Sequence, residues 1–238
     1  MKILIDLHTH TVSSGHAYST LQENVQEAKN KGLEYYGFSD HGPMMPGAPH
    51  IFHFQNIKVV PREINGVKVL RGVEANIIDF KGSIDMTDAT LRYIDYVIAS
   101  AHMPCIISRT IDENTNALIG AMKNPRVQFI GHPDDGRFQV DYKRLVKAAK
   151  EENVILEVNN SSLDPKAFRQ NGRENVIEML KLCKELEVQV LVSSDAHISF
   201  SVGEFNYALE ILTELNFPEH LVINTNPEKF LRFIGFTQ

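Results

Sequence analysis

Seven short apolar runs recur along this chain of 238 residues, and helical patterns separate most of them. The runs are rich in β-branched and aromatic residues and are nearly continuous rather than alternating, which is typical of parallel strands buried on both faces. They cover residues 3–7, 35–39, 67–73, 96–99, 127–130, 154–158 and 188–192. This strand-and-helix alternation predicts an α/β fold, and we expect residues 1–238 to form one domain.

Side chains of the types that bind metal ions follow six of the seven runs. They are His8, His10, His16, His41, Glu74, His102, His132, Asp195 and His197. Ligands from six strand ends can meet only if the strands surround a common centre, as they do at the C-terminal face of a barrel. The sequence therefore predicts a seven-stranded β/α barrel, one strand short of the TIM type, with a metal site at that face.

Spacing supports the same reading at two strand ends. His8 and His10 are two residues apart, as are Asp195 and His197, so in an extended chain each pair points the same way. Asp6 shares that spacing with His8, and we expect its carboxylate to support the His8 ring. Nine ligands exceed what one ion uses, which is roughly three to six, so two or three ions are predicted.

A single histidine after a strand is more often a loop or core residue than a ligand. For nine residues of metal-binding types at equivalent positions, that explanation would need repeated coincidence. The other histidines lack such positions. We expect His50 and His53 to be polar residues of a long loop over residues 42–56, which is a candidate lid. His220, beside Pro218, is expected to be incidental.

Helix signals fall between the runs. Thr20 and Glu23 form a capping-box pattern before a helix that should stop at Gly32. Apolar residues at helical spacing predict helices over 141–153, 173–187 and 203–215, and a proline at the first turn predicts another from residue 227 through 233.

Composition excludes several classes of protein. The formal net charge is −6, which does not favour nucleic acid or an anionic membrane as a partner. No apolar run approaches the roughly 18 residues of a membrane span, and no secretory signal pattern is visible. The two distant cysteines, Cys105 and Cys183, suit a reducing compartment. We therefore expect a cytoplasmic protein.

The motifs H-T-H, D-H-G, A-H-M, G-H-P and S-D-A-H, with an isolated Glu74 between them, resemble the polymerase and histidinol phosphatase (PHP) superfamily over essentially the whole chain. Residues 131–133, 157–161 and 203–205 look most similar to its YcdX-like phosphatases. The resemblance implies a distorted (β/α)7 TIM-like barrel, a trinuclear and usually zinc-containing site, and phosphoesterase activity.

The resemblance also implies how the ligands divide among three divalent ions. One ion would take His8, His10, Glu74 and Asp195, a second would share Glu74 and add His102 and His132, and a third would take His16, His41 and His197. Zinc is expected, although Mn²⁺ or Fe²⁺ also suits such ligands. Each group leaves positions open for water or substrate, which is typical of a catalytic site.

Three divalent ions carry +6, and two carboxylates and a hydroxide reduce the local charge of the cavity to about +3. This positive charge would attract a phosphate even though the chain as a whole is acidic. The expected reaction is attack on phosphorus by a hydroxide that bridges two ions, with Asp195, Glu74 and His132 as the catalytic residues. The expected partner is a small phosphomonoester, and a homo-oligomer is compatible with the family.

Outside the ligands, Arg169 is the predicted phosphate-binding residue. Weaker candidates are Arg109, Arg137 and Arg173, while Asp134 and Asp135 could orient His132 or protonate the leaving group. Asn159 and Asn160 could line the pocket, and Cys105 is expected to serve packing.

Three alternatives stay open. An amidohydrolase-like enzyme also begins with H-x-H on a barrel strand, but it usually bridges its metals with a lysine where this chain has none. A nuclease-type phosphodiesterase belongs to the wider superfamily, but the acidic chain favours a small substrate. A non-catalytic metal-binding protein would be signalled by a missing ligand, and none is missing.

Overall fold

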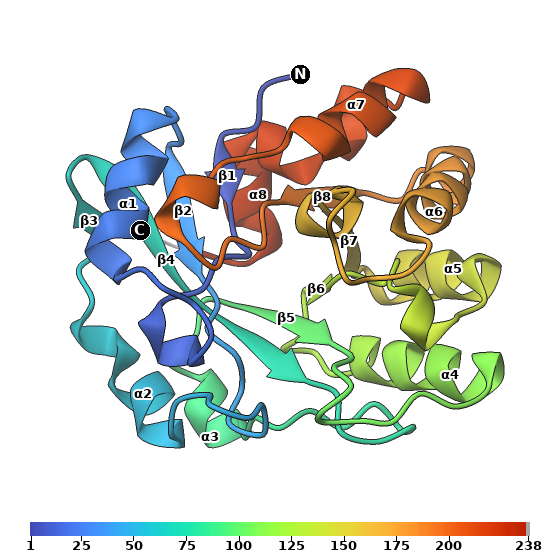
Figure 1. Ribbon diagram of the computed structural model, residues 1–238, viewed down its shortest axis with the longest axis horizontal. Coiled ribbons are helices and arrows are strands. Elements are labelled where there is room, and N and C mark those ends of the chain that lie inside the picture. The colour runs from blue at the N-terminus through green and yellow to red at the C-terminus, as the bar shows by residue number, and fades with distance from the viewer. Residues whose placement is uncertain (237–238) are drawn as a thin grey trace.

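The computed structural model describes residues 1–236 and shows a parallel sheet curled into a nearly closed barrel (Figure 1). Its strands are β1 (Ile5–Asp6), β2 (Tyr35–Phe38), β3 (Glu63–Ile64), β4 (Val67–Asn76), β5 (Tyr96–Ser100), β6 (Phe129–Ile130), β7 (Ile155–Asn159) and β8 (Val190–Ser193). The order is β1-β2-β4-β5-β6-β7-β8, and all these neighbours are parallel. The predicted seven strands and the TIM-like barrel are confirmed.

The short strand β3 was not predicted. It pairs antiparallel with the start of β4 through a turn at Asn65 and Gly66, both with positive φ. An Asn-Gly pair at a two-residue hairpin turn is a familiar signal. The two residues of β3 are too few and too polar to register as an apolar run.

Helices cover the outside of the barrel (Figure 1). They are α1 (Leu21–Asn30), α2 (Ile51–Asn56), α3 (Asp88–Leu91), α4 (Ile111–Met122), α5 (Tyr142–Glu152), α6 (Gly172–Leu186), α7 (Asn206–Glu214) and α8 (Pro227–Phe233). Five of these were predicted, although α7 begins three residues later than expected because Gly203 has a positive φ. Helix α4 was missed despite a capping box between Thr110 and Glu113.

The predicted loop over residues 42–56 is wrong in its last part, because residues 51–56 form α2. Its first part is hydrogen-bonded to the barrel: the Gly42 N–H donates to the carbonyl of Glu74, and the Met44 N–H donates to the Asp85 carboxylate. Met45 is nearly buried. These contacts make the segment a packed wall of the barrel mouth.

Between β1 and β8 the ring closes without a strand ladder. A single bridge pairs Thr9 with Ala196, and the side chain of Asn224 spans the gap below it. Asn224 Nδ2 donates to the carbonyls of Ile5 at 2.8 Å and Val192 at 2.7 Å, while its Oδ1 accepts from the Val192 N–H at 3.2 Å. We call this region the β1–β8 junction.

Apolar side chains fill the N-terminal half of the barrel interior. Tyr96, Phe129 and Phe230 pack there with aliphatic residues from the other strands, and α8 covers that end. The Tyr96 side chain lies so close to Gly37 and Gly72 that a Cβ would come within 2.4 Å of its hydroxyl at Gly37 and 2.2 Å of its ring at Gly72. A second apolar layer lies between the sheet and the outer helices. The opposite, C-terminal end is therefore where a site can open.

Within residues 1–236, no helix combines the length and the apolarity that crossing a membrane would require.

Candidate metal centre

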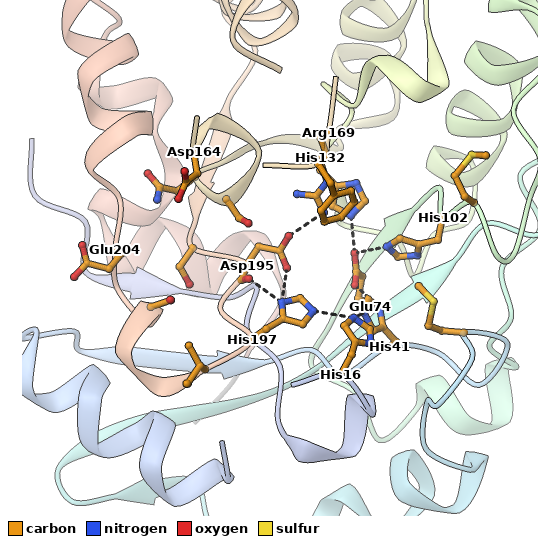
Figure 2. A pocket seen from close by; sticks show the side chains of 18 of the residues that line it. His16, His41, Glu74, His102, His132, Asp164, Arg169, Asp195, His197 and Glu204 are labelled. Atoms are coloured by element: carbon orange, nitrogen blue, oxygen red, sulfur yellow. Dashed lines mark hydrogen bonds and ion pairs between the residues drawn. The ribbon is translucent and has the colours of Figure 1, made fainter. Parts of the chain in front are cut away.

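All nine predicted ligands lie together at the C-terminal end of the barrel. Seven of them line a cavity of about 1150 Å³, and His8 and His10 lie beneath it, fully buried. Figure 2 shows His16, His41, Glu74, His102, His132, Asp195 and His197 pointing toward one another. They come from β4, which contains Glu74, and from the segments that follow β1, β2, β5, β6 and β8. The convergence expected from the sequence is present.

The first group of ligand atoms lies between β1, β4 and β8. His8 Nε2 is 3.2 Å from Glu74 Oε1 and 3.5 Å from Asp195 Oδ1. His10 Nε2 is 3.3 Å from Asp195 Oδ1 and 3.6 Å from Glu74 Oε2. Two imidazole nitrogens and two carboxylate oxygens thus enclose one position.

The second group shares Glu74. Its Oε1 lies 2.9 Å from His132 Nε2 and 3.2 Å from His102 Nε2. Because the other oxygen of Glu74 faces His10 and His41, this one carboxylate contacts histidines that follow β1, β2, β5 and β6.

The third group consists of three imidazoles. His16 Nε2 is 3.3 Å from His41 Nε2 and 3.1 Å from His197 Nε2. A neutral imidazole has one N–H, so these three nitrogens cannot all satisfy one another by hydrogen bonds. The opposite nitrogen of His41 lies 2.6 Å from Glu74 Oε2, which links this group to the others.

Several atoms at the centre lack a hydrogen bond of acceptable geometry to any described residue: His8 Nε2, His10 Nε2, His41 Nδ1 and Glu74 Oε2. A buried polar atom without a partner costs about 1–3 kcal/mol. Four such atoms on ligand-type side chains that face one another fit divalent cations, which would satisfy them together.

Protonation favours the same conclusion. Burial lowers the pKa of His10 and of His102 below the usual range of histidine, so both rings are held neutral, as a metal ligand must be. Burial alone would raise the pKa of Glu74 and of Asp195, but neighbouring side chains, His8 foremost, hold both well below their usual range. Both carboxylates are therefore ionised. Burial disfavours a proton on His8, but Glu157, Glu74 and Asp195 raise the pKa of that ring well above its usual range, so a divalent ion would have to displace this proton.

The outer nitrogens of the imidazoles are fixed by hydrogen bonds. His102 Nδ1 donates to Asn76 Oδ1 at 2.7 Å, and His10 Nδ1 lies 3.0 Å from Ser14 Oγ, which itself donates to Asp40. His8 Nδ1 lies 2.6 Å from Glu157 Oε1. Such contacts set which ring nitrogen faces the centre.

The predicted contact between Asp6 and His8 is wrong. Asp6 accepts from the hydroxyl and N–H of Ser194 and from the Gly203 N–H. Strand β1 ends at Asp6, so the alternation of an extended chain does not continue to His8. The carboxylate that supports His8, through its Nδ1, is Glu157. Sequence reasoning missed this contact, although a charged residue inside an apolar run was a usable signal.

Arg169 lies in the cavity wall with most of its surface buried. Its Nη2 donates to Asp195 Oδ2 at 2.9 Å, and its Nη1 donates to Ser162 Oγ at 2.9 Å and to Asn159 Oδ1 at 3.2 Å. Its Nε is buried without a partner among residues 1–236. The guanidinium is thus rigidly held in the cavity wall.

The other three arginines are less suitable. Arg137 lines the cavity, but Asp135 pairs with it. Arg109 and Arg173 are exposed and pair with Glu113 and Glu214, outside the cavity.

The two aspartates after His132 do not contact its ring. Asp135 is bound to Arg137, and Asp134 is fully buried outside the cavity lining, where burial raises its pKa to about 7. Neither carboxylate lines the cavity in which a leaving group would be protonated. Asn160 does line the cavity, while Asn159 reaches the site through its bonds to Asp195 and Arg169.

The remaining candidates lie at the edges. His50 caps α2, and His53 lies 3.4 Å from Asp40, so neither belongs to the cluster. His220 lies in a surface turn. The Cys105 thiol is half-buried with a pKa raised by burial to about 11, in keeping with a packing role.

Comparison with known proteins gives consistent results. Residues 6–161 match the family model of the PHP domain. A probable phosphatase from Clostridium novyi is 45% identical over 234 residues, which cover 98% of this chain and 95% of that protein. One from Clostridium botulinum is 46% identical with the same coverage.

Among solved structures, histidinol phosphate phosphatase from Lactococcus lactis, complexed with zinc, L-histidinol and phosphate, is similar with a TM-score of 0.64. The alignment covers 90% of this chain and 94% of that one at 18% identity, so it shows a shared fold.

Proposed function

This chain belongs to the PHP domain family, and from that membership and the geometry of the cluster we propose that it is a metal-dependent phosphatase acting on a small phosphomonoester. The observation that carries the proposal is the convergence of nine ligand-type side chains at the C-terminal end of the barrel, seven of which line an open cavity. The relatives that match nearly the whole chain are named probable phosphatases, which supports the same activity.

We assign the ligands to three ions, most suitably Zn²⁺, in the groups already described. His8, His10, Glu74 and Asp195 hold the first ion; Glu74, His102 and His132 hold the second; His16, His41 and His197 hold the third. Neutral imidazoles and ionised carboxylates suit Zn²⁺, and they also accept Mn²⁺ or Fe²⁺. Bound divalent ions would supply an activated water and neutralise charge on the phosphate oxygens.

The residues of this chain then divide the remaining tasks. Glu74 holds the groups together through both oxygens, and Asp195 offers Oδ1 to the cluster while Oδ2 anchors Arg169. Arg169, which lines the cavity beside Asp195, binds an oxygen of the phosphate. Since Asp195 fixes the guanidinium, the phosphate is oriented toward the cluster before any bond changes.

The rest of the cavity supports a small substrate over a nucleic acid. Figure 2 places the cluster on one side and the carboxylates of Asp164 and Glu204 on the other. A polyanion would have to run past those two carboxylates, whereas a phosphomonoester carries its only strong negative charge to the metal side. The cavity lining also includes Met103, Phe168 and Tyr207.

The test combines metal analysis with assays on the same preparation. Elemental analysis of native protein should give two to three divalent ions per chain, and p-nitrophenyl phosphate should be hydrolysed faster than bis-p-nitrophenyl phosphate or an amide panel. His41→Ala should lose metal and activity, whereas His220→Ala, outside the site, should lose neither. Fewer than two metals per chain, or full activity in His41→Ala, would refute the proposal.

A further inference from the structure

Strand β7 is the one parallel strand of the described barrel that contributes none of the nine ligands, yet its end carries two buried polar side chains. Glu157 and Asn159 are both fully buried. We propose that Glu157 is a positioning residue that holds the ligands of the first two ions, while the third ion is independent of it. The inference rests on the proposed metal site.

Four donors meet the two carboxylate oxygens of Glu157. Oε1 accepts from His8 Nδ1 at 2.6 Å and from the Ser193 hydroxyl. Oε2 accepts from the backbone N–H of His132 and from Asn159 Nδ2 at 3.1 Å. Strands β1, β6 and β8 are thereby joined to β7 at the level of the metal centre.

The bond to His8 decides which face of that ring binds metal. If Nδ1 donates its proton to Glu157, Nε2 carries the free lone pair, and Nε2 is the atom that lies 3.2 Å from Glu74 Oε1. The opposite tautomer would place a proton on Nε2 and exclude an ion.

The bond to His132 holds a strained backbone. His132 has φ of 27°, in the left-handed region that non-glycine residues seldom adopt. Such a conformation costs about 1–3 kcal/mol and persists only where neighbouring groups enforce it. The N–H bond to Glu157 does so, and the ring then reaches Glu74 with Nε2 at 2.9 Å.

Asn159 extends the support to Asp195. Its Nδ2 lies 3.1 Å from Glu157 Oε2 and 3.1 Å from Asp195 Oδ2, and Asp195 is also a left-handed residue, with φ of 53°. Ligands from the first and second groups therefore depend on Glu157. The third group is held mainly elsewhere: the segment before His16 is tied to Asp40 through Thr11 and Ser14, and His197 alone of this group contacts Asp195.

Glu157→Gln tests hydrogen-bond acceptance without changing volume. Whichever way the amide turns, its NH₂ replaces one acceptor. If the NH₂ group faces His8, it favours the His8 tautomer that is protonated at Nε2. If the NH₂ group faces His132, it repels the backbone N–H of His132. We expect zinc affinity at the first two sites to fall roughly 10- to 100-fold, measured by competition with a chromophoric chelator on the purified full chain.

Asp40→Asn is the matched control, because Asp40 is also a buried carboxylate with several hydrogen bonds. It should weaken the third site and, because Ser14 links it to His10, the first site, and it should leave the second site near wild type. Circular dichroism of each metal-free variant reports whether it is folded. Equal zinc affinities in wild type and a folded Glu157→Gln would overturn the inference.

The wild type supplies a second test that does not depend on a variant folding. In the zinc-loaded protein, nitrogen NMR of the histidine rings should show His8 protonated at Nδ1. A His8 protonated at Nε2 would overturn the inference. Wild-type protein that binds no zinc would instead refute the proposed function, so the two failures are distinguishable.

Discussion

Replacing Asn224 should open the β1–β8 junction. This side chain is fully buried, and it makes three hydrogen bonds to the backbone of Ile5 and Val192 across the gap where no strand ladder exists. Asn224→Ala removes all three and leaves two carbonyls and one N–H buried without partners. At about 1–1.5 kcal/mol for each bond, the free energy of unfolding should fall by about 3–5 kcal/mol.

Urea unfolding, followed by circular dichroism, measures this loss. The metal-free protein must be used, because bound ions stabilise the native state and would mask the effect. Asn30→Ala, on the exposed surface of α1, is the control and should change stability by less than about 0.5 kcal/mol.

A further variant separates lost bonding from lost volume. Asn224→Asp keeps the size of the side chain but replaces the donor Nδ2 by an oxygen, which would repel the carbonyl oxygens of Ile5 and Val192. It should therefore destabilise the protein at least as much as Asn224→Ala. If both variants unfold within about 0.5 kcal/mol of the Asn30→Ala control, Asn224 does not close the barrel and the reasoning is refuted.

Three other predictions follow from local geometry. Gly15→Ala should weaken zinc binding, because the φ of Gly15 is 78° and a Cβ there would lie 2.4 Å from the Gly47 carbonyl oxygen. The control Gly32→Ala, where φ is 73° and the space is open, should leave the zinc affinity unchanged. Chelator competition measures both affinities. Thr110→Ala should lower the free energy of unfolding by about 1 kcal/mol in urea through loss of the α4 capping box; no change would contradict the cap. The Cys183 thiol, buried and with its pKa raised by burial to about 12, should resist iodoacetamide at neutral pH until urea unfolds the chain, and labelling of native protein would contradict its burial.

The sequence was sufficient for the strands and for the side chains that converge at their C-terminal ends, because both are local signals. A strand buried on both faces is a continuous apolar run, and most of the ligand-type residues come within a few positions of the end of such a run. Even so, β4 extends through Glu74 to Asn76, because buried polar residues continued a strand that seemed to end at Val73.

The supporting contacts could not be predicted in the same way. Glu157 and His8 are 149 residues apart, and nothing in their spacing pairs them. The nearer candidate, Asp6, was the natural choice, but it turns to Ser194 where β1 ends. Which carboxylate contacts which ring depends on how the barrel closes, and that is fixed by tertiary packing.

The distribution of the ligands along the chain has a consequence for synthesis and folding. The first lies at residue 8 and the last at residue 197, and Asp195 and His197 fall beyond the segment that matches the family model. A centre assembled from such distant residues has no local nucleus, and contacts of this kind form late and slowly. A chain still emerging from the ribosome would hold His8 and His10 long before their partners exist. If the proposed metal site is correct, metal binding should therefore be the last event of maturation, and the metal content of a preparation should report what fraction of its molecules have completed the barrel.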